Sequence, residues 1–216
     1  IPTWIGPKIL TTTDLYYATM DGEEDWHPDL HRGRFPVRSA DQTTYMVDKY
    51  LAYANLSGIE AWLKNISLPA TCDLTFYPVA EATQNYVVES YTAPGGWTGI
   101  FPEDPNPGGD QLYCITYGAA TQNLSDAFNQ GRWAIIYSGH GEFTGWEMGF
   151  DPNDVRNLTN YGKFPIVISH ACMTGDFAQD EVFGETWVLQ YDRGALAYYG
   201  ASTLTNWPHD DIQERG

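Results

Sequence analysis

The chain has 216 residues, of which 43% are hydrophobic and 18% are charged. This balance excludes a generally disordered chain, and the length fits one large domain or one domain with an appendage. The formal net charge of −17 argues against nucleic acid and anionic lipid as partners, and no apolar run of 18 residues predicts a membrane span. The acidic surface either steers cationic ligands or simply keeps an extracellular protein soluble.

The first half of the chain predicts short elements separated by loops. Residues 1–36 mix Thr, Tyr, Pro and Gly and are expected to form an edge strand and loops. Apolar residues at helical spacing predict a helix over 40–54. The other predictions are short strands at 33–37 and 65–68, a helix at 81–91 and a long surface loop at 93–110.

The second half has a clearer alternation of strands and helices. Buried strands are predicted at 133–137, 164–169 and 195–199, with a further strand at 112–117. Helical segments are predicted at 123–129, 154–158 and 182–191. Apolar strands that alternate with helices favour a parallel sheet covered on both faces.

Two of the buried strands run directly into reactive side chains. Strand 133–137 is followed by Ser138-Gly139-His140-Gly141, and strand 164–169 is followed by His170-Ala171-Cys172. Functional groups of open parallel sheets gather beyond the carboxyl ends of the strands. If the two strands are neighbours, His140 and Cys172 lie side by side. That arrangement suits a thiol nucleophile, because the imidazole generates the thiolate and later protonates the leaving amine.

Each of these residues also has a simpler explanation. A free cysteine is often a buried core residue, and a histidine in a turn often bonds only to backbone. His170 is a rival base, since it lies two residues before Cys172 on the same strand. We favour His140, because side chains that point in parallel from one strand rarely align for proton transfer.

The glycines and the cysteine count add to this interpretation. Gly141 allows the backbone to turn after His140. Its N–H is expected to join that of Cys172 in an oxyanion hole, a contribution of about 3 kcal/mol per donor. The three cysteines, Cys72, Cys114 and Cys172, are too few for a disulfide framework, and their odd number leaves at least one free thiol.

The ordered motifs resemble the gingipain-type cysteine peptidases of the caspase-like clan. They comprise S-G-H-G after one strand, D-V-R-N-L-T-N before the next, and H-A-C-M-T-G-D-F after it, within a match that extends over residues 13–207. The resemblance implies an α/β caspase-like three-layer sandwich, with a mostly parallel sheet and helices on both faces. The domain would occupy 1–216, and earlier strand–helix units of the fold are expected before Ile1.

The resemblance also implies roles for individual residues. Cys172 is the nucleophile, His140 the base, and Gly141 with Cys172 the oxyanion donors. Asp73 corresponds to a carboxylate that supports the dyad, and Trp207 to an aromatic wall of the pocket before the scissile bond. Either Ala80 or Glu81 aligns near the acid at the bottom of that pocket. Ser202 and Thr203, at a strand end, are expected to contact the substrate backbone.

An acidic stretch near the start of the chain suggests a structural metal site. Its acids and histidines are Asp21, Glu23, Glu24, Asp25, His27, Asp29 and His31. Closely spaced oxygen ligands suit Ca²⁺ better than Zn²⁺, and related enzymes carry calcium. The expected ligands are Asp21, Glu24, Asp25 and Asp29, and the alternative is a solvated acidic loop.

The sequence therefore predicts a secreted cysteine endopeptidase that cuts protein or peptide substrates after a basic residue, at the cell surface or outside the cell. No catalytic cofactor is expected, and other fragments of the same precursor are possible partners. One alternative is a sortase-like transpeptidase of a bacterial secretion system that uses the same dyad. The other is a non-catalytic binding or adhesin module on the same fold.

Overall fold

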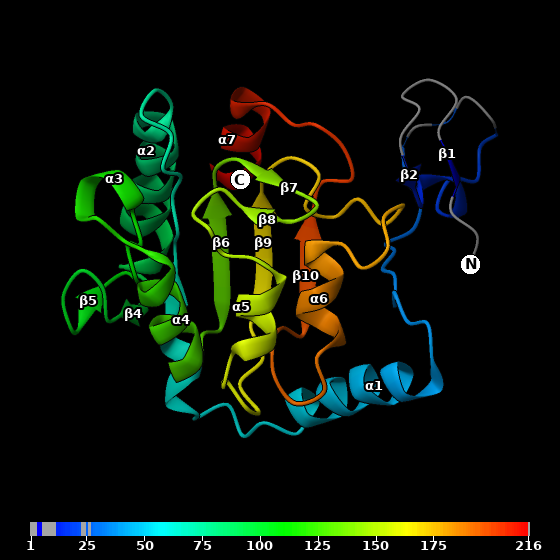
Figure 1. Ribbon diagram of the computed structural model, residues 1–216, viewed down its shortest axis with the longest axis horizontal. Helices are drawn as coiled ribbons and strands as arrows, with labels where there is room; N and C mark the ends of the chain where they lie inside the picture. The colour runs from blue at the N-terminus through cyan, green and yellow to red at the C-terminus, as the bar shows by residue number, and fades with distance from the viewer. Residues whose placement is uncertain (1–3, 6–11, 23–24, 26, 216) are drawn as a thin grey trace.

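The computed structural model describes residues 4–5, 12–22, 25 and 27–215. Its centre is a parallel sheet with the strand order β10 (Ala197–Gly200), β9 (Ile166–His170), β6 (Ala134–Ser138) and β3 (Ile66–Ser67), shown in Figure 1. All three pairings in this sheet are parallel. The carboxyl ends of the strands consequently lie along one edge, at the top of Figure 1.

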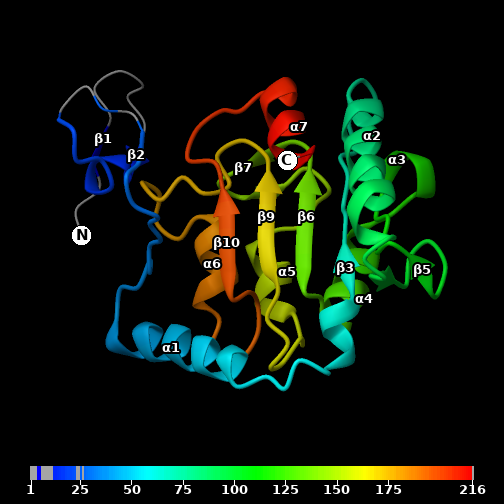
Figure 2. The ribbon, with the colours of Figure 1, turned by 180° about the vertical axis from the view of Figure 1, so that it is seen from behind.

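Helices cover both faces of the sheet. The helices α5 (Pro152–Asn157) and α6 (Phe183–Leu189) lie in front of it in Figure 1. From behind, Figure 2 shows α2 (Tyr77–Val87) and α7 (Trp207–Arg215) toward the other side. This three-layer arrangement confirms the predicted α/β sandwich with a mostly parallel sheet. None of the helices in the described part of the chain is both long and apolar enough to span a bilayer.

The remaining elements are peripheral to the sheet. Helix α1 (Ala40–Ala54) runs below the amino-terminal ends of the strands, while α3 (Cys114–Tyr117) and α4 (Thr121–Gln130) lie beside β3 and β6. A π-helical turn, η3 (Val88–Thr92), extends α2, and 3-10 turns occur at η1 (Leu15–Tyr17) and η2 (Ala61–Lys64). Among the described residues there are also three antiparallel pairs: β1 (Trp4–Ile5) with β2 (Thr12–Thr13), β4 (Thr98–Gly99) with β5 (Asn106–Pro107), and β7 (Gly141–Glu142) with β8 (Gly145–Trp146).

Alternation along the strands creates the main core. Ile135 and Tyr137 of β6 are fully buried and belong to the same core cluster as Val167 of β9. The aromatic residues of this cluster include Phe128, Trp146, Phe150, Phe183 and Trp187. Burial of a large side chain contributes about 1.5–3 kcal/mol, so this cluster is the principal support of the strand ends that carry the site.

Three predictions of secondary structure are wrong or incomplete. Residues 114–117 form a helix rather than a strand, because the backbone pairing with residues 66–70 runs from Asp110 and ends at Cys114. Gly118, in a left-handed conformation, then ends the helix. Residues 33–37 have no strand partner and are coil. The helix expected at 81–91 begins at Tyr77, and α7 was not predicted.

Candidate active site

The register of the sheet brings His140 and Cys172 to corresponding positions. Ser138, the last residue of β6, pairs with His170, the last residue of β9. Each reactive residue lies two positions beyond its strand end. Both residues line one cavity of about 500 Å³ at the carboxyl edge of the sheet. The cavity is also bounded by Gly141, Glu142, Thr144, Gly145, Trp146, Glu147, Met173 and Leu204.

Gly141 allows the two strand-end segments to approach each other. A Cβ atom on Gly141 would lie 2.6 Å from Cγ2 of Thr174 and 2.9 Å from Cβ of Ala171. Both distances are well below a normal carbon–carbon contact of about 3.5–4.0 Å. The segment after His140 therefore packs against the segment around Cys172 only if position 141 has no side chain.

A carboxylate orients the His140 ring. Nε2 of His140 lies 2.8 Å from Oδ2 of Asp73, and the two side chains are 45% and 21% exposed. Oδ1 of Asp73 also accepts hydrogen bonds from the backbone N–H groups of Thr75 and Phe76, at 2.6 and 3.1 Å. The Thr75 N–H and the His140 ring lower the pKa of Asp73. With Nε2 bound to an ionised carboxylate, Nδ1 is the nitrogen that can accept a proton.

Two aromatic rings pack against His140. Trp207, the first residue of α7, lies edge-on to the imidazole with a centroid separation of 5.3 Å. Phe76 stacks on Trp207 at 5.5 Å and also meets the His140 ring edge-on, at 6.5 Å. These contacts restrict the rotamer of His140 and form an aromatic wall beside its ring.

The backbone at Cys172 presents its thiol to the segment that leads into α7. The Thr205 N–H points at Sγ of Cys172 over 3.4 Å, and Sγ lies 3.7 Å from both Oγ1 and the carbonyl oxygen of Thr205. The next residue, Met173, has a φ of 55°, and its N–H donates to the Thr203 carbonyl at 3.0 Å. A positive φ in a non-glycine residue is a costly conformation that the surrounding contacts must hold, and such residues cluster at functional sites.

His170 is placed differently from His140. It is 6% exposed at the end of β9 and is absent from the residues that line the Cys172 cavity. Burial lowers the pKa of His170 to about 4, so the ring is neutral at physiological pH. It therefore packs in the structure, while His140 faces the cavity.

Comparison with known proteins identifies the family. The model of peptidase family C25 matches residues 1–215. The chain belongs to this family. Lys-gingipain of Porphyromonas gingivalis is 28% identical over 212 residues, which cover 95% of this chain and 11% of that protein. Gingipain R2 of the same organism is 26% identical over 182 residues, covering 82% of this chain and 23% of that protein.

Solved structures agree on the fold of this C25 chain. A solved protease structure has 27% sequence identity and a TM-score of 0.83, covering 99% of this chain and 45% of that chain. The structure of the Arg-specific cysteine proteinase gingipain R has 23% sequence identity and a TM-score of 0.78, and the match covers 99% of this chain and 49% of that chain. The predicted resemblance is thereby confirmed. The C25 chain spans about half of these solved chains and a smaller share of the curated relatives.

The structure does not bring Glu81 to the cavity. This residue lies on α2 and is 7% exposed, and its carboxylate accepts hydrogen bonds from the backbone N–H and the hydroxyl of Thr116. A carboxylate held in this way supports the junction of α2 with α3. The prediction that Glu81 forms the bottom of a substrate pocket is therefore replaced by a structural role, and neighbouring Ala80 is fully buried.

Ser202 is engaged away from the Cys172 cavity. The hydroxyl of Ser202 donates to the Thr12 carbonyl at 2.8 Å, and Ser202 lines a second cavity, of about 340 Å³, on the β10 side of the sheet. Thr203 uses its carbonyl to hold Met173. The residue of this segment that reaches the Cys172 cavity is Leu204.

The acidic stretch is partly consistent with a cation site. Asp21, Asp25 and Asp29 each offer a carboxylate oxygen, and these oxygens lie within 4.8 Å of one another. Glu24, the fourth expected ligand, lies outside the described residues. Converging carboxylates of this kind fit the oxygen ligands that Ca²⁺ prefers.

Sequence reasoning missed two features of the site. Thr205 contacts the thiol, and its hydroxyl donates to Oδ2 of Asp210 at 2.7 Å. Cys72 and Cys114 form a disulfide, which leaves Cys172 as the free cysteine. Neither feature has a local sequence signal, since each depends on segments that are distant in the chain.

Proposed function

We propose that this chain carries the catalytic residues of a cysteine endopeptidase. The observation that supports this most directly is the shared cavity of His140 and Cys172, at matched positions beyond two paired parallel strands. The carboxylate of Asp73 holds Nε2 of His140, so Nδ1 is available to take the thiol proton. The arrangement is that of a nucleophile, its base and a group that orients the base.

The chemistry follows from these roles. The Cys172 thiolate attacks the scissile carbonyl carbon, and a C–S bond forms as the carbonyl electrons move to oxygen. In this proposal the N–H groups of Gly141 and Cys172 donate hydrogen bonds that stabilise this oxyanion. The His140 imidazolium then donates its proton to the leaving amine, the C–N bond breaks, and a thioester remains. Water activated by His140 hydrolyses the thioester and restores the thiol.

A basic residue before the scissile bond is the substrate preference that the site supports. Trp207 is half-buried beside His140, and an indole is the side chain on which a guanidinium or ammonium group stacks best. Asp210 lies one helical turn after Trp207, and its carboxylate is joined through Thr205 to the thiol side of the site. Burial raises the pKa of Asp210, and a cation bound nearby would offset that desolvation. The names of Lys-gingipain and of the Arg-specific gingipain R point the same way.

An extracellular or cell-surface location is consistent with the Cys72–Cys114 disulfide, because disulfides persist in oxidising compartments. Other segments of a precursor are candidate partners, since one solved relative is a complex of gingipain pro- and mature domains. Calcium bound by Asp21, Asp25 and Asp29 would be a structural ion with no role in the chemistry.

The test uses the intact protein. Wild type, Cys172→Ala and His140→Ala are compared for cleavage of a peptide library and for labelling by an electrophilic peptide with Arg before the reactive carbon. We expect labelling of Cys172, complete loss of cleavage in Cys172→Ala and nearly complete loss in His140→Ala, with unchanged circular dichroism. Wild-type turnover in Cys172→Ala would refute the assignment.

The same assay separates the alternatives. A binding module would give neither cleavage nor labelling of Cys172. A transpeptidase would be labelled but, in the presence of added amines, would give amide products in place of free acids.

A further inference from the structure

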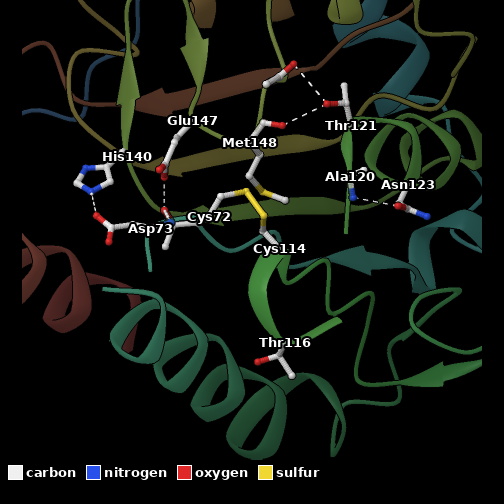
Figure 3. The surroundings of a disulfide bond; sticks show 12 residues. Cys72, Asp73, Cys114, Thr116, Ala120, Thr121, Asn123, His140, Glu147 and Met148 are labelled. Carbon is white, nitrogen blue, oxygen red and sulfur yellow. Dashed lines mark hydrogen bonds and ion pairs between the residues drawn. A yellow bond between two sulfur atoms is a disulfide. The ribbon is translucent and has the colours of Figure 1, made fainter. Parts of the chain in front are cut away.

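The disulfide lies next to the residue that orients His140. It joins Cys72, in the loop after β3, to Cys114, the first residue of α3, across 42 positions of sequence. Cys72 immediately precedes Asp73 in the chain. Figure 3 shows the bond on one side of this loop and the Asp73–His140 contact on the other.

The loop that carries Asp73 is held to the rest of the protein mainly on the side that precedes Asp73. Before it, the Thr71 N–H donates to the Ser138 carbonyl at 3.0 Å, and the Thr71 hydroxyl donates to the Glu147 carboxylate. After it, Leu74 is 79% exposed, and the bonds of Asp73 to the residues that follow are local ones to 75–77. The Asp73 N–H donates to Oγ1 of Thr71 at 3.2 Å, and the Cys72 sulfur is the covalent attachment to the protein body next to the Asp73 carboxylate.

The other end of the disulfide is well supported. Both half-cystines pack against the main core, and the Cys114 N–H donates to the Ala70 carbonyl at 3.4 Å. Helix α3 is in turn tied to α2 by the bonds of Thr116 to Glu81. The disulfide therefore connects the Asp73 loop to a rigid block on the far side of the loop from His140.

The Asp73–His140 contact is too exposed to hold the loop by itself. Ion pairs and hydrogen bonds between solvent-exposed groups contribute little net stability, because water competes for them and side-chain freedom is lost. A catalytic group nevertheless has to be held within about 0.5 Å of its working position by its supporting residues. A covalent attachment at the adjacent residue restricts the loop at all times, whether or not the hydrogen bond is formed.

We propose that the Cys72–Cys114 disulfide is a positioning element of the active site, which fixes Asp73 so that it orients His140. The inference rests on the function proposed above. The disulfide does not touch substrate and acts through Asp73. Its loss should therefore lower kcat only in a protein that still carries Asp73.

A double-mutant cycle in the full-length protein tests this dependence. The four proteins are wild type, the pair Cys72→Ala with Cys114→Ala, Asp73→Asn, and the combination of all three. We expect the cysteine pair to lower kcat about tenfold with little change in KM, by analogy with the loss of an orienting hydrogen-bond partner. In the Asp73→Asn background the same pair should lower kcat less than about twofold.

A second readout does not need peptidase activity. Cys172 is the free cysteine in wild type, so its alkylation rate by iodoacetamide, measured against pH, reports the thiolate that His140 stabilises. We expect the midpoint of this profile to move to higher pH in the cysteine pair and in Asp73→Asn by the same amount. If wild type fails to cleave peptides but the shift occurs, the proposed function fails while the positioning role stands.

Ser39→Ala is the matched control for stability. It removes the side-chain N-cap of α1, which lies below the amino-terminal ends of the strands and away from the Asp73 loop, so it should lower the unfolding midpoint and leave the alkylation profile in place. If the alanine pair melts below the assay temperature, Cys72→Val with Cys114→Ala replaces it, because valine restores most of the lost volume. An equal loss of kcat with and without Asp73, or no loss at all, would overturn the proposal.

Discussion

Replacement of Gly141 by alanine is a sharp test of how the site is assembled. The new Cβ would lie 2.6 Å from Cγ2 of Thr174 and 2.9 Å from Cβ of Ala171. These distances fall about 0.6–0.9 Å short of the closest comfortable carbon–carbon contact. The segments around His140 and Cys172 must therefore move apart by nearly 1 Å, since one obstacle is a backbone-attached methyl group.

A displacement of this size is large for a catalytic pair. A misplacement of 1 Å can cost about 100-fold in rate, while overpacking of a well-packed region costs about 1–3 kcal/mol of stability. We expect Gly141→Ala to lower kcat about 100-fold and to lower the free energy of unfolding by about 1–3 kcal/mol.

The assay measures kcat and KM on a fluorogenic peptide, with urea unfolding in parallel. Gly33→Ala is the matched control, because nothing lies within 4 Å of a Cβ at Gly33 and its φ is outside the left-handed region. Its kinetics should equal those of wild type. If Gly141→Ala retained kcat within about twofold, the close packing of the two segments would not be what aligns the dyad.

Three further predictions concern specificity, metal binding and pH. Asp210→Asn should reduce kcat/KM for Arg and Lys substrates at least about tenfold more than for a Leu substrate, since a charged hydrogen bond contributes about 1.5–3 kcal/mol; equal losses on all three peptides would remove Asp210 from the pocket. Calcium at about 100 times its Kd should stabilise the fold by about 2.7 kcal/mol, and replacing Asp21, Asp25 and Asp29 with Asn should abolish the shift in Tm; a Tm unmoved by chelation in wild type would argue against the site. Burial raises the pKa of Glu214 to about 8, so the folded state keeps a proton that the unfolded state releases near pH 4.5. Stability should accordingly fall as pH rises from about 4.5 to 8, at up to about 1.4 kcal/mol per pH unit from this group, and Glu214→Gln should flatten the dependence in urea unfolding; an identical slope in both proteins would contradict it.

The sequence alone determined the features that are written in contiguous residues. An apolar run followed at once by S-G-H-G, and another followed by H-A-C, predicted two neighbouring parallel strands and the reactive residues beyond them. The register Ser138↔His170 agrees with that expectation. The predicted α/β sandwich and the family resemblance were confirmed for the same reason, because strand periodicity and ordered motifs are local properties of the chain.

Only the tertiary structure decided which distant groups complete the site. Asp73 reaches His140 across 67 residues, Thr205 reaches Cys172 across 33, and the disulfide closes 42. The family resemblance predicted Asp73 as the carboxylate beside His140. It also predicted Glu81 in a substrate pocket, but in the structure that carboxylate accepts a hydrogen bond from Thr116. The positions of these loops depend on packing and on long-range hydrogen bonds, which leave no periodic pattern in the sequence. The groups that contact His140 and Cys172 can therefore be identified only in the folded chain.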